Sequence, residues 1–237
     1  GEPDFETPAP LLEAIAAATR DRGTGYTPAA GLPALRQAIA DDYRERFAAN
    51  VSPAQIVVTP GASGALQLAL AALINPGDGV LLSDPGYPCN RQFVNLVGGK
   101  PQPLVLKADN HFTLTASELL GAWQPDTRLA MVASPDNPTG NMLSLDTLQA
   151  MAEGAVQQGG LLLVDEIYQG LCYRGPAQSV LSRTDQVLVI NSFSKYFCMT
   201  GWRLGWLVAP EPLVPAIERL AQNLFLAPST PAQYGAL

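Results

Sequence analysis

Short apolar runs alternate with helix-like stretches along almost the whole chain, and this alternation restricts the possible folds more than any other feature. The runs predict buried strands at residues 56–59, 80–82, 102–106, 129–133, 161–164, 187–190 and 204–209. Apolar residues at helical spacing predict helices at residues 11–20, 31–47, 60–74, 115–123, 144–158 and 211–225. Strands that alternate with helices predict an α/β domain with a largely parallel sheet and right-handed crossovers.

Composition narrows the class of partner. The 237 residues carry a net charge of −7, with 15% charged and 47% hydrophobic residues. This is the composition of a globular chain, and the negative charge argues against nucleic acid or an anionic membrane surface as the partner. No stretch is long and apolar enough to span a membrane. Three widely spaced cysteines and one histidine form no metal-binding pattern, so we expect no metal site and a reduced, cytoplasmic setting.

A lysine and an arginine follow the strand at residues 187–190. The strand leads to Ser192, Ser194 and Lys195, and Arg203 comes eight residues after the lysine. A lysine that is withdrawn from water gives up its proton readily, so its amine can attack a carbonyl and form a Schiff base. Arginine offers a rigid fork that suits phosphate. A ligand with both an aldehyde and a phosphate fits this pair, and pyridoxal 5′-phosphate is such a ligand; an ordinary lysine at a strand end remains the alternative.

Two other strand ends carry residues suited to the same ligand. Asp165 directly follows the apolar run 161–164, so its carboxylate needs a partner such as a protonated pyridine nitrogen. Tyr87 follows the run 80–82, and ligands of open α/β sheets bind outside the carboxyl ends of the strands. The turn at residues 60–64 joins a strand to a helix N-terminus, which offers backbone N–H groups to a phosphate.

The segment Ser-Phe-Ser-Lys-x7-Arg-x-Gly around Lys195 resembles the cofactor-lysine motif of the class I/II aminotransferases, which are fold-type I pyridoxal-phosphate enzymes. Further segments resemble the family in its own order: residues 26–36, the phosphate loop at 60–64, Asn-Pro-Thr-Gly at 137–140 and Asp-Glu-Ile-Tyr at 165–168. The resemblance implies the three-layer α/β/α large domain, with a mostly parallel seven-stranded sheet in which the strand after the lysine is the antiparallel exception.

The resemblance also implies a role for each site residue. Lys195 would hold the cofactor as a Schiff base (the internal aldimine) and then act as general base and acid, with Asp165 and Tyr168 as the other catalytic residues. Asp165 would pair with the pyridine nitrogen, Tyr168 and Asn137 would bond the phenolic oxygen, and Tyr87 would stack on the ring. The residues implied to hold the phosphate are Ala62, Ser63, Ser192, Ser194 and Arg203, with Tyr26 contributed by a neighbouring subunit.

The implied activity is transfer of an amino group between an L-amino acid and a 2-oxo acid by a homodimer. We expect an N-terminal segment at residues 1–25, the cofactor-binding large domain at 26–210, and at 211–237 the helix and linker towards a C-terminal domain. In the family, the arginine that binds the substrate carboxylate lies in that domain, and none of the eleven arginines matches its motif. We therefore expect the chain to be a fragment, inactive alone, and the amino-acid specificity is not readable.

Two other functions remain open. Related enzymes of the same fold type break a carbon–sulfur bond as β-lyases, and these often carry histidine where Tyr168 stands, which favours transamination. The second alternative is the aminotransferase-like effector-binding domain of certain transcription regulators. That function requires a basic DNA-binding segment upstream.

Overall fold

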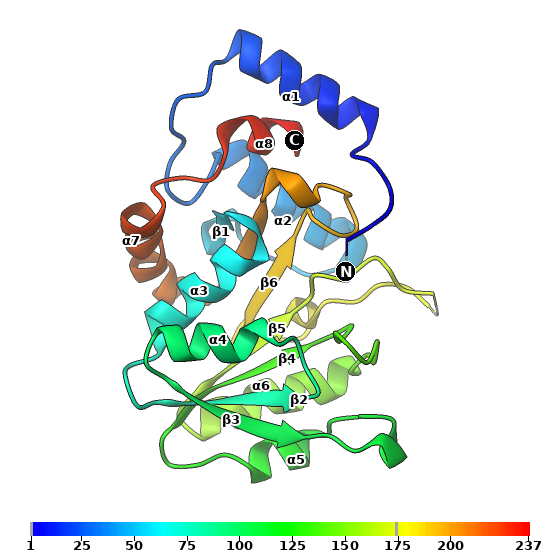
Figure 1. Cartoon of the computed structure of the whole chain (residues 1–237), viewed down its shortest axis with the longest axis vertical. Helices are drawn as coiled ribbons and strands as arrows, with labels where there is room; N and C mark the ends of the chain where they lie inside the picture. Colours follow the sequence, from blue (N-terminus) through cyan, green and yellow to red (C-terminus); the bar gives the residue numbers. More distant parts are fainter. Residues whose placement is uncertain (1, 174) are drawn as a thin grey trace.

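The computed structural model describes residues 2–173 and 175–237, and a single sheet with helices on both faces dominates it (Figure 1). The strands are β1 (Ile56–Thr59), β2 (Gly79–Asp84), β3 (Lys100–Val105), β4 (Thr127–Ala133), β5 (Leu161–Asp165), β6 (Leu188–Ser192) and β7 (Gly205–Val208). The α-helices are α1 (Ala9–Asp21), α2 (Pro33–Phe47), α3 (Gly61–Leu73), α4 (Cys89–Leu96), α5 (Ala116–Gly121), α6 (Leu145–Gln157), α7 (Val214–Leu224) and α8 (Thr230–Gly235).

The seven strands lie in the order β1-β7-β6-β5-β4-β2-β3. All neighbours pair in parallel except β7, which is antiparallel to both β6 and β1. A parallel return needs a long crossover, usually a helix. The connection from β6 to β7 contains only a short 3₁₀ turn, Thr200–Trp202, so the chain turns back directly and β7 runs the opposite way. The predicted antiparallel strand after the lysine is confirmed.

The central strands are buried on both faces because a layer of helices covers each face. Side chains alternate along the strands, so that Val164 and Val189 contribute to one core while Leu163 and Ile190 contribute to the other. Helices α3, α4 and α7 cover one face, and α2, α5 and α6 cover the other. This packing explains why the strands read as continuous apolar runs in the sequence.

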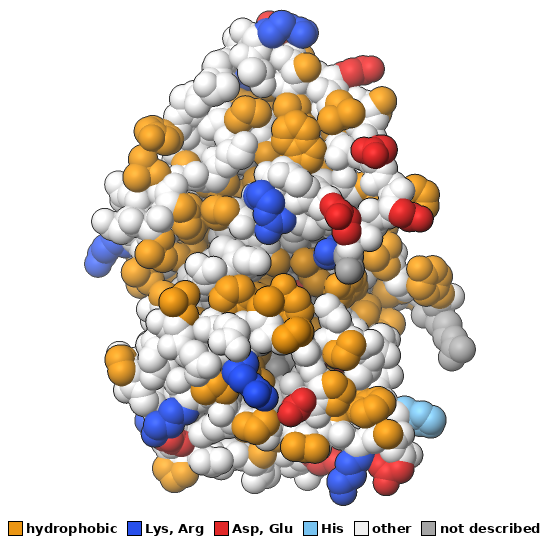
Figure 2. Space-filling view, viewed as in Figure 1, with side chains coloured by type: hydrophobic (Ala, Val, Ile, Leu, Met, Phe, Trp, Pro, Cys, Tyr) orange, Lys and Arg blue, Asp and Glu red, His pale blue; other side chains and the backbone are white. Residues whose placement is uncertain are grey.

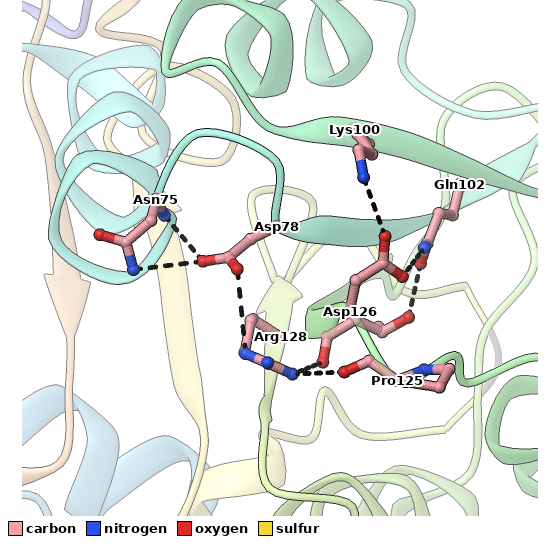
Figure 3. A network of polar contacts seen from close by, with 8 residues as sticks. Asn75, Asp78, Lys100, Gln102, Pro125, Asp126 and Arg128 are labelled. Carbon is pink, nitrogen blue, oxygen red and sulfur yellow. Dashed lines mark hydrogen bonds and ion pairs between the residues drawn. The ribbon is translucent and has the colours of Figure 1, made fainter.

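The amino ends of β2, β3 and β4 carry a polar network, drawn in Figure 3. Lys100 lies 3.2 Å from Asp126, and Gln102 donates to the other oxygen of the same carboxylate at 3.0 Å. Arg128 approaches Asp78 to 3.9 Å. These charges lie at the end of the strands opposite to the predicted site. Lys100 pairs with Asp126 there and lies away from that site.

The helix predicted at residues 211–225 is interrupted. The chain first forms a 3₁₀ turn, Glu211–Leu213, and α7 begins only at Val214. Pro212 and Pro215 lack backbone N–H groups, which prevents a continuous α-helical hydrogen-bond ladder through this region. The short helices α4 and α8 were not predicted, because neither is long enough to show a clear apolar period. The other predicted helices and strands are confirmed with their ends shifted by a few residues.

The surface shows no single dominant charge on the face drawn in Figure 2, where lysine and arginine side chains lie as separate groups among acidic and apolar ones. Across residues 2–173 and 175–237, no helix is both long and apolar enough to cross a bilayer. Within the same residues, no three His, Cys, Asp or Glu side chains come together in a way that could hold a metal ion.

Candidate active site

A cavity of about 450 Å³ opens at the carboxyl ends of β4, β5 and β6 and beside the N-terminus of α3. The parallel strands all deliver their following residues to this edge, so segments distant in sequence meet there. Nine of the eleven predicted site residues line the cavity: Ala62, Ser63, Tyr87, Asn137, Asp165, Tyr168, Ser194, Lys195 and Arg203.

Two glycines allow Arg203 to lie at the N-terminus of α3. A Cβ on Gly61, whose φ is +70°, would lie 2.7 Å from the Arg203 Nη2 atom. A Cβ on Gly205 would lie 2.7 Å from the backbone carbon of Gly61 and 2.8 Å from the Ala62 nitrogen. The backbone of β7 therefore touches the helix start, and the guanidinium sits beside the first N–H groups of the helix. Helix N–H groups and an arginine fork together form a site for a phosphate.

Ser192 and Ser194 lie one above the other at the end of β6. The Ser192 hydroxyl lies 2.8 Å from Ser194 Oγ and 3.0 Å from the Leu204 carbonyl oxygen, and it accepts from the Ser194 N–H at 3.0 Å. Ser194 lines the cavity, whereas Ser192 is 1% exposed and lies outside its lining. The predicted contact of Ser192 with a phosphate stays a prediction; in this structure its hydroxyl supports Ser194.

Lys195 is half-buried in the loop between β6 and β7 and lines the cavity. Backbone bonds brace the loop, from Phe193 N–H to the Leu204 carbonyl at 3.1 Å and from Met199 N–H to the Phe193 carbonyl at 3.0 Å. These bonds hold the backbone of the loop that carries the Lys195 amine. Lys107 is exposed outside the cavity, and Lys100 lies in the opposite network, so Lys195 is the cavity lysine of the described chain.

Asp165 ends β5 and lies at the floor of the cavity. One of its oxygens accepts from the Ile167 N–H at 2.9 Å. Burial raises the pKa of Asp165 to about 6, and the nearby Asp136 carboxylate pushes the pKa in the same direction. A carboxylate that is withdrawn from water in this way gains strongly from a cationic partner.

Asn137 and Tyr168 meet across the cavity wall. The Asn137 amide donates to the Tyr168 hydroxyl at 3.4 Å. Burial, followed by the charge of Asp165, raises the pKa of Tyr168, so the phenol keeps its proton and can donate. Tyr87 forms another part of the wall; its contact with Cys89, together with burial, raises its pKa to about 12.

Tyr26 lies outside the cavity of its own chain. Its side chain is 84% exposed, on the segment between α1 and α2. Its predicted contact with the phosphate of a neighbouring subunit stays a prediction.

Sequence reasoning missed several residues of the cavity. Glu2 and Thr200 both line it, and the Thr200 hydroxyl donates to Glu2 Oε1 at 3.0 Å. Thr200 lies in the lysine segment, where its small polar side chain close to Lys195 was the available signal. Glu2 offered no signal, because only the fold brings the N-terminal segment back to the loop after β6.

The arrangement of a lysine, an aspartate, an asparagine–tyrosine pair and a phosphate cradle also occurs in known proteins. The family model for aminotransferase class I and II matches residues 1–237. The chain belongs to this aminotransferase family.

Individual relatives agree with the family match. Valine–pyruvate aminotransferase of Mycobacterium tuberculosis is 39% identical over 239 residues, which cover 100% of this chain and 61% of the relative. Aspartate aminotransferase of Sulfurisphaera tokodaii is 37% identical, covering 100% of this chain and 60% of the relative. The solved structure of an aminotransferase from Mycobacterium tuberculosis matches with a TM-score of 0.95 at 38% identity, over 100% of this chain and 61% of that one.

These comparisons confirm the predicted family and its three-layer α/β fold with a mostly parallel seven-stranded sheet. None of these three relatives carries the name of a carbon–sulfur lyase or of a transcription regulator. The chain spans about 60% of the length of the relatives that it matches.

Aminotransferases of this family use pyridoxal 5′-phosphate, and the residues of the cavity fit that cofactor. Because residues 61 and 205 are glycines, the Arg203 guanidinium and strand β7 can lie against the start of α3, so the guanidinium and the helix N–H groups can bind one phosphate together. Asp165 offers a half-buried carboxylate to a pyridinium nitrogen, and Lys195 offers an amine in the same cavity.

Proposed function

We propose that the protein is a pyridoxal-phosphate-dependent aminotransferase, which moves an amino group between an L-amino acid and a 2-oxo acid. The observation that carries this proposal is the meeting of Lys195, Asp165, the Asn137–Tyr168 pair and Arg203 in one cavity. These groups come from three separate strand ends: Asn137 follows β4, Asp165 and Tyr168 lie at the end of β5, and Lys195 and Arg203 lie in the loop after β6. A chance meeting of three such segments is a poor explanation.

The phosphate would be held by the Arg203 guanidinium, the Ala62 N–H and the Ser63 and Ser194 hydroxyls, with Ser192 behind Ser194. These contacts fix one end of the cofactor. Because a helix N-terminus and a guanidinium both favour negative charge, this end of the cavity selects the phosphorylated form of the cofactor.

The ring would be oriented from three sides. Tyr87 would stack on its face, Asn137 and Tyr168 would donate to its phenolic oxygen, and Asp165 would accept from its nitrogen; all four residues line the cavity. When bound, the cofactor supplies an electron sink for the bond broken at the substrate Cα. The ionised carboxylate of Asp165 would keep that nitrogen protonated.

Lys195 would carry the cofactor between turnovers and move the proton during them. Its amine lies in the cavity on a braced loop. Once a substrate amine had replaced it, the Lys195 amine would be free to act as general base towards the proton on the substrate Cα and then as general acid. Hydrolysis by one water would release the keto acid, and a second 2-oxo acid would take up the amino group by the reverse sequence.

We further propose a cytoplasmic homodimer of amino acid metabolism, in which Tyr26 reaches the phosphate of the neighbouring subunit. The exposure of Tyr26 and the three free cysteines of the described chain support this assignment. We keep the proposed division into residues 1–25, 26–210 and 211–237, although α7 packs on α3 and contributes Ile217 to the core of the sheet.

The test is an absorption spectrum of the full-length protein with pyridoxal phosphate, followed by addition of single amino acids. Transamination predicts that the absorbance of the bound cofactor bleaches with one or more amino acids while the matching keto acid appears. Formation of pyruvate and ammonia without bleaching would instead indicate a lyase. Cofactor binding that no amino acid changes would contradict the enzyme assignment and favour an effector-binding domain.

A further inference from the structure

The segment that carries Tyr26 is held in place although Tyr26 itself is exposed. On one side, the Gly25 carbonyl accepts from the Thr230 hydroxyl at 2.7 Å. On the other side, the Thr27 hydroxyl accepts from the side-chain amide of Gln233 at 3.0 Å. Both partners belong to α8, which is more than 200 residues further along the chain. The residues on either side of Tyr26 are therefore tied to one helix.

Gln233 is the centre of this attachment. It is 0% exposed, and its oxygen accepts from the Leu32 N–H at 2.8 Å at the start of α2. Its nitrogen donates to Thr27 Oγ1 and to the Pro228 carbonyl, the latter at 3.1 Å. A buried amide is costly unless its hydrogen bonds are made. The three bonds join the Tyr26 segment, α2 and α8 into one unit.

Strand β1 of the sheet also contacts the segment that follows Tyr26. The Val58 N–H of β1 donates to the Ala30 carbonyl at 3.0 Å. Gly31 has a φ of +97°, and a Cβ there would lie 2.5 Å from Val58 and 3.1 Å from the Gln233 oxygen. Only glycine allows the chain to pass this closely between β1 and α8.

An exposed tyrosine whose backbone is held in place is well suited to contact another molecule. A tyrosine has few side-chain rotations, so fixing its backbone removes much of the entropy that binding would cost. We propose that Gln233 is a positioning residue that, through Thr27, holds Tyr26 ready for the phosphate bound in the cavity of a second copy of this chain. This inference rests on the proposed function, in which Tyr26 completes the neighbouring site.

The test compares dissociation constants of pyridoxal phosphate and of pyridoxal, which lacks the phosphate, on the full-length protein. Tyr26→Phe should raise the constant for pyridoxal phosphate about 10-fold to 100-fold, the loss of one hydrogen bond to a charged group. Thr27→Val keeps the side-chain shape but removes the acceptor for Gln233, and should raise it roughly 3-fold to 10-fold. Neither variant should change the constant for pyridoxal.

Three further variants separate positioning from general damage. Thr27→Ser retains a hydroxyl and should restore the affinity, and Thr24→Val alters an exposed threonine of the same segment and should have no effect. Gln233→Leu should act like Thr27→Val but more strongly. Because Gln233→Leu removes three buried bonds, its folding is checked by thermal unfolding, and Thr27→Val carries the test if it does not fold.

The deciding result is the double variant Tyr26→Phe with Thr27→Val. If Thr27 acts through Tyr26, the second change adds nothing once the tyrosine hydroxyl is gone. An equal loss in both backgrounds, or an equal loss for pyridoxal, would overturn the inference and leave the aminotransferase proposal standing. No effect of Tyr26→Phe would overturn both this inference and the shared site, whereas transamination is measured separately.

Discussion

Asp165 and Glu166 are adjacent in the chain, yet their carboxyl groups lie on opposite faces of the sheet. Asp165 faces the cavity, where Leu66 of α3 also contributes to the lining. Glu166 is 0% exposed on the other face, where it accepts from the Val180 N–H at 2.9 Å. Burial, followed by the charge of Glu166, raises the pKa of the nearby Tyr43 of α2. The alternation of side chains along a strand separates the two neighbours. The Asp165 carboxyl therefore lines the cavity, and the Glu166 carboxyl lies in the core.

Glu166 gives a prediction for the pH dependence of stability. Burial raises its pKa to about 8 in the folded chain, against an ordinary value of 4.5. Between these values the folded chain binds a proton that the unfolded chain does not. The free energy of unfolding should therefore fall as the pH rises from about 6 to 8, by on the order of 1 kcal/mol per pH unit from this group, with a smaller slope as the pH nears 8.

Chemical denaturation of the wild type and of Glu166→Gln at pH 6, 7 and 8 measures this slope. The amide keeps an oxygen for the Val180 N–H but cannot ionise, so the variant should lack this part of the pH dependence. Asp165, whose pKa is about 6, still titrates at the lower end of this range, but it is present in both proteins, so the difference between their slopes reports Glu166. The same slope in both proteins would show that Glu166 does not hold the proton.

Replacement of Lys195 should abolish turnover. In Lys195→Ala, the group proposed to move the proton is lost, and general acid–base catalysis typically contributes about 100-fold to 10,000-fold. Keto-acid formation by the full-length protein is the measurement. Lys100→Ala is the matched control, because Lys100 lies in the network with Asp126 at the other end of the strands and should leave turnover unchanged. Appreciable transamination by Lys195→Ala would contradict the assigned role.

Replacement of Asp165 should weaken the binding of pyridoxal phosphate. Asp165→Asn keeps the size of the side chain and an acceptor for the Ile167 N–H, but removes the charge opposite the pyridinium nitrogen. Loss of a charged hydrogen bond of about 1.5–3 kcal/mol raises the dissociation constant roughly 10-fold to 100-fold. Titration of pyridoxal phosphate into the full-length protein measures it, with Asp84→Asn as control. Unchanged affinity in Asp165→Asn would refute the pairing.

The contact between Gly205 and the start of α3 should tolerate no side chain. In Gly205→Ala the new Cβ would meet the Gly61 carbon at 2.7 Å, and backbone cannot move aside as a flexible side chain can. We expect a loss of about 1–3 kcal/mol of folding free energy, which lowers the melting temperature by roughly 2–4 °C per kcal/mol in a chain of this size. Gly121→Ala, whose Cβ meets nothing within 4 Å, is the control. Equal melting temperatures for the two variants would contradict the contact.

Much of the fold and of the site follows from local signals in the sequence. The strands that are buried on both faces read as apolar runs, and the residue that ends each run, such as Asp165 after Val164, predicts what is delivered to the carboxyl edge of the sheet. The spacing of Lys195 and Arg203 likewise depends on one loop between two adjacent strands. These features are encoded within about ten residues of one another, so they can be read without the tertiary structure.

What only the tertiary structure decided are contacts between segments that are distant in sequence. The position of Glu2 beside Thr200, the close approach of Gly205 to Gly61, and the hold of Gln233 on Thr27 all depend on how the chain packs as a whole. The hydrogen bond between Glu166 and the Val180 N–H is of the same kind, since Val180 begins a short 3₁₀ turn, Val180–Ser182, whose position no apolar period in the sequence indicates. The sequence by itself determined which groups stand at the ends of the strands, through hydrophobic period and motif; packing determined which of them touch, because contact depends on the full set of distances between elements.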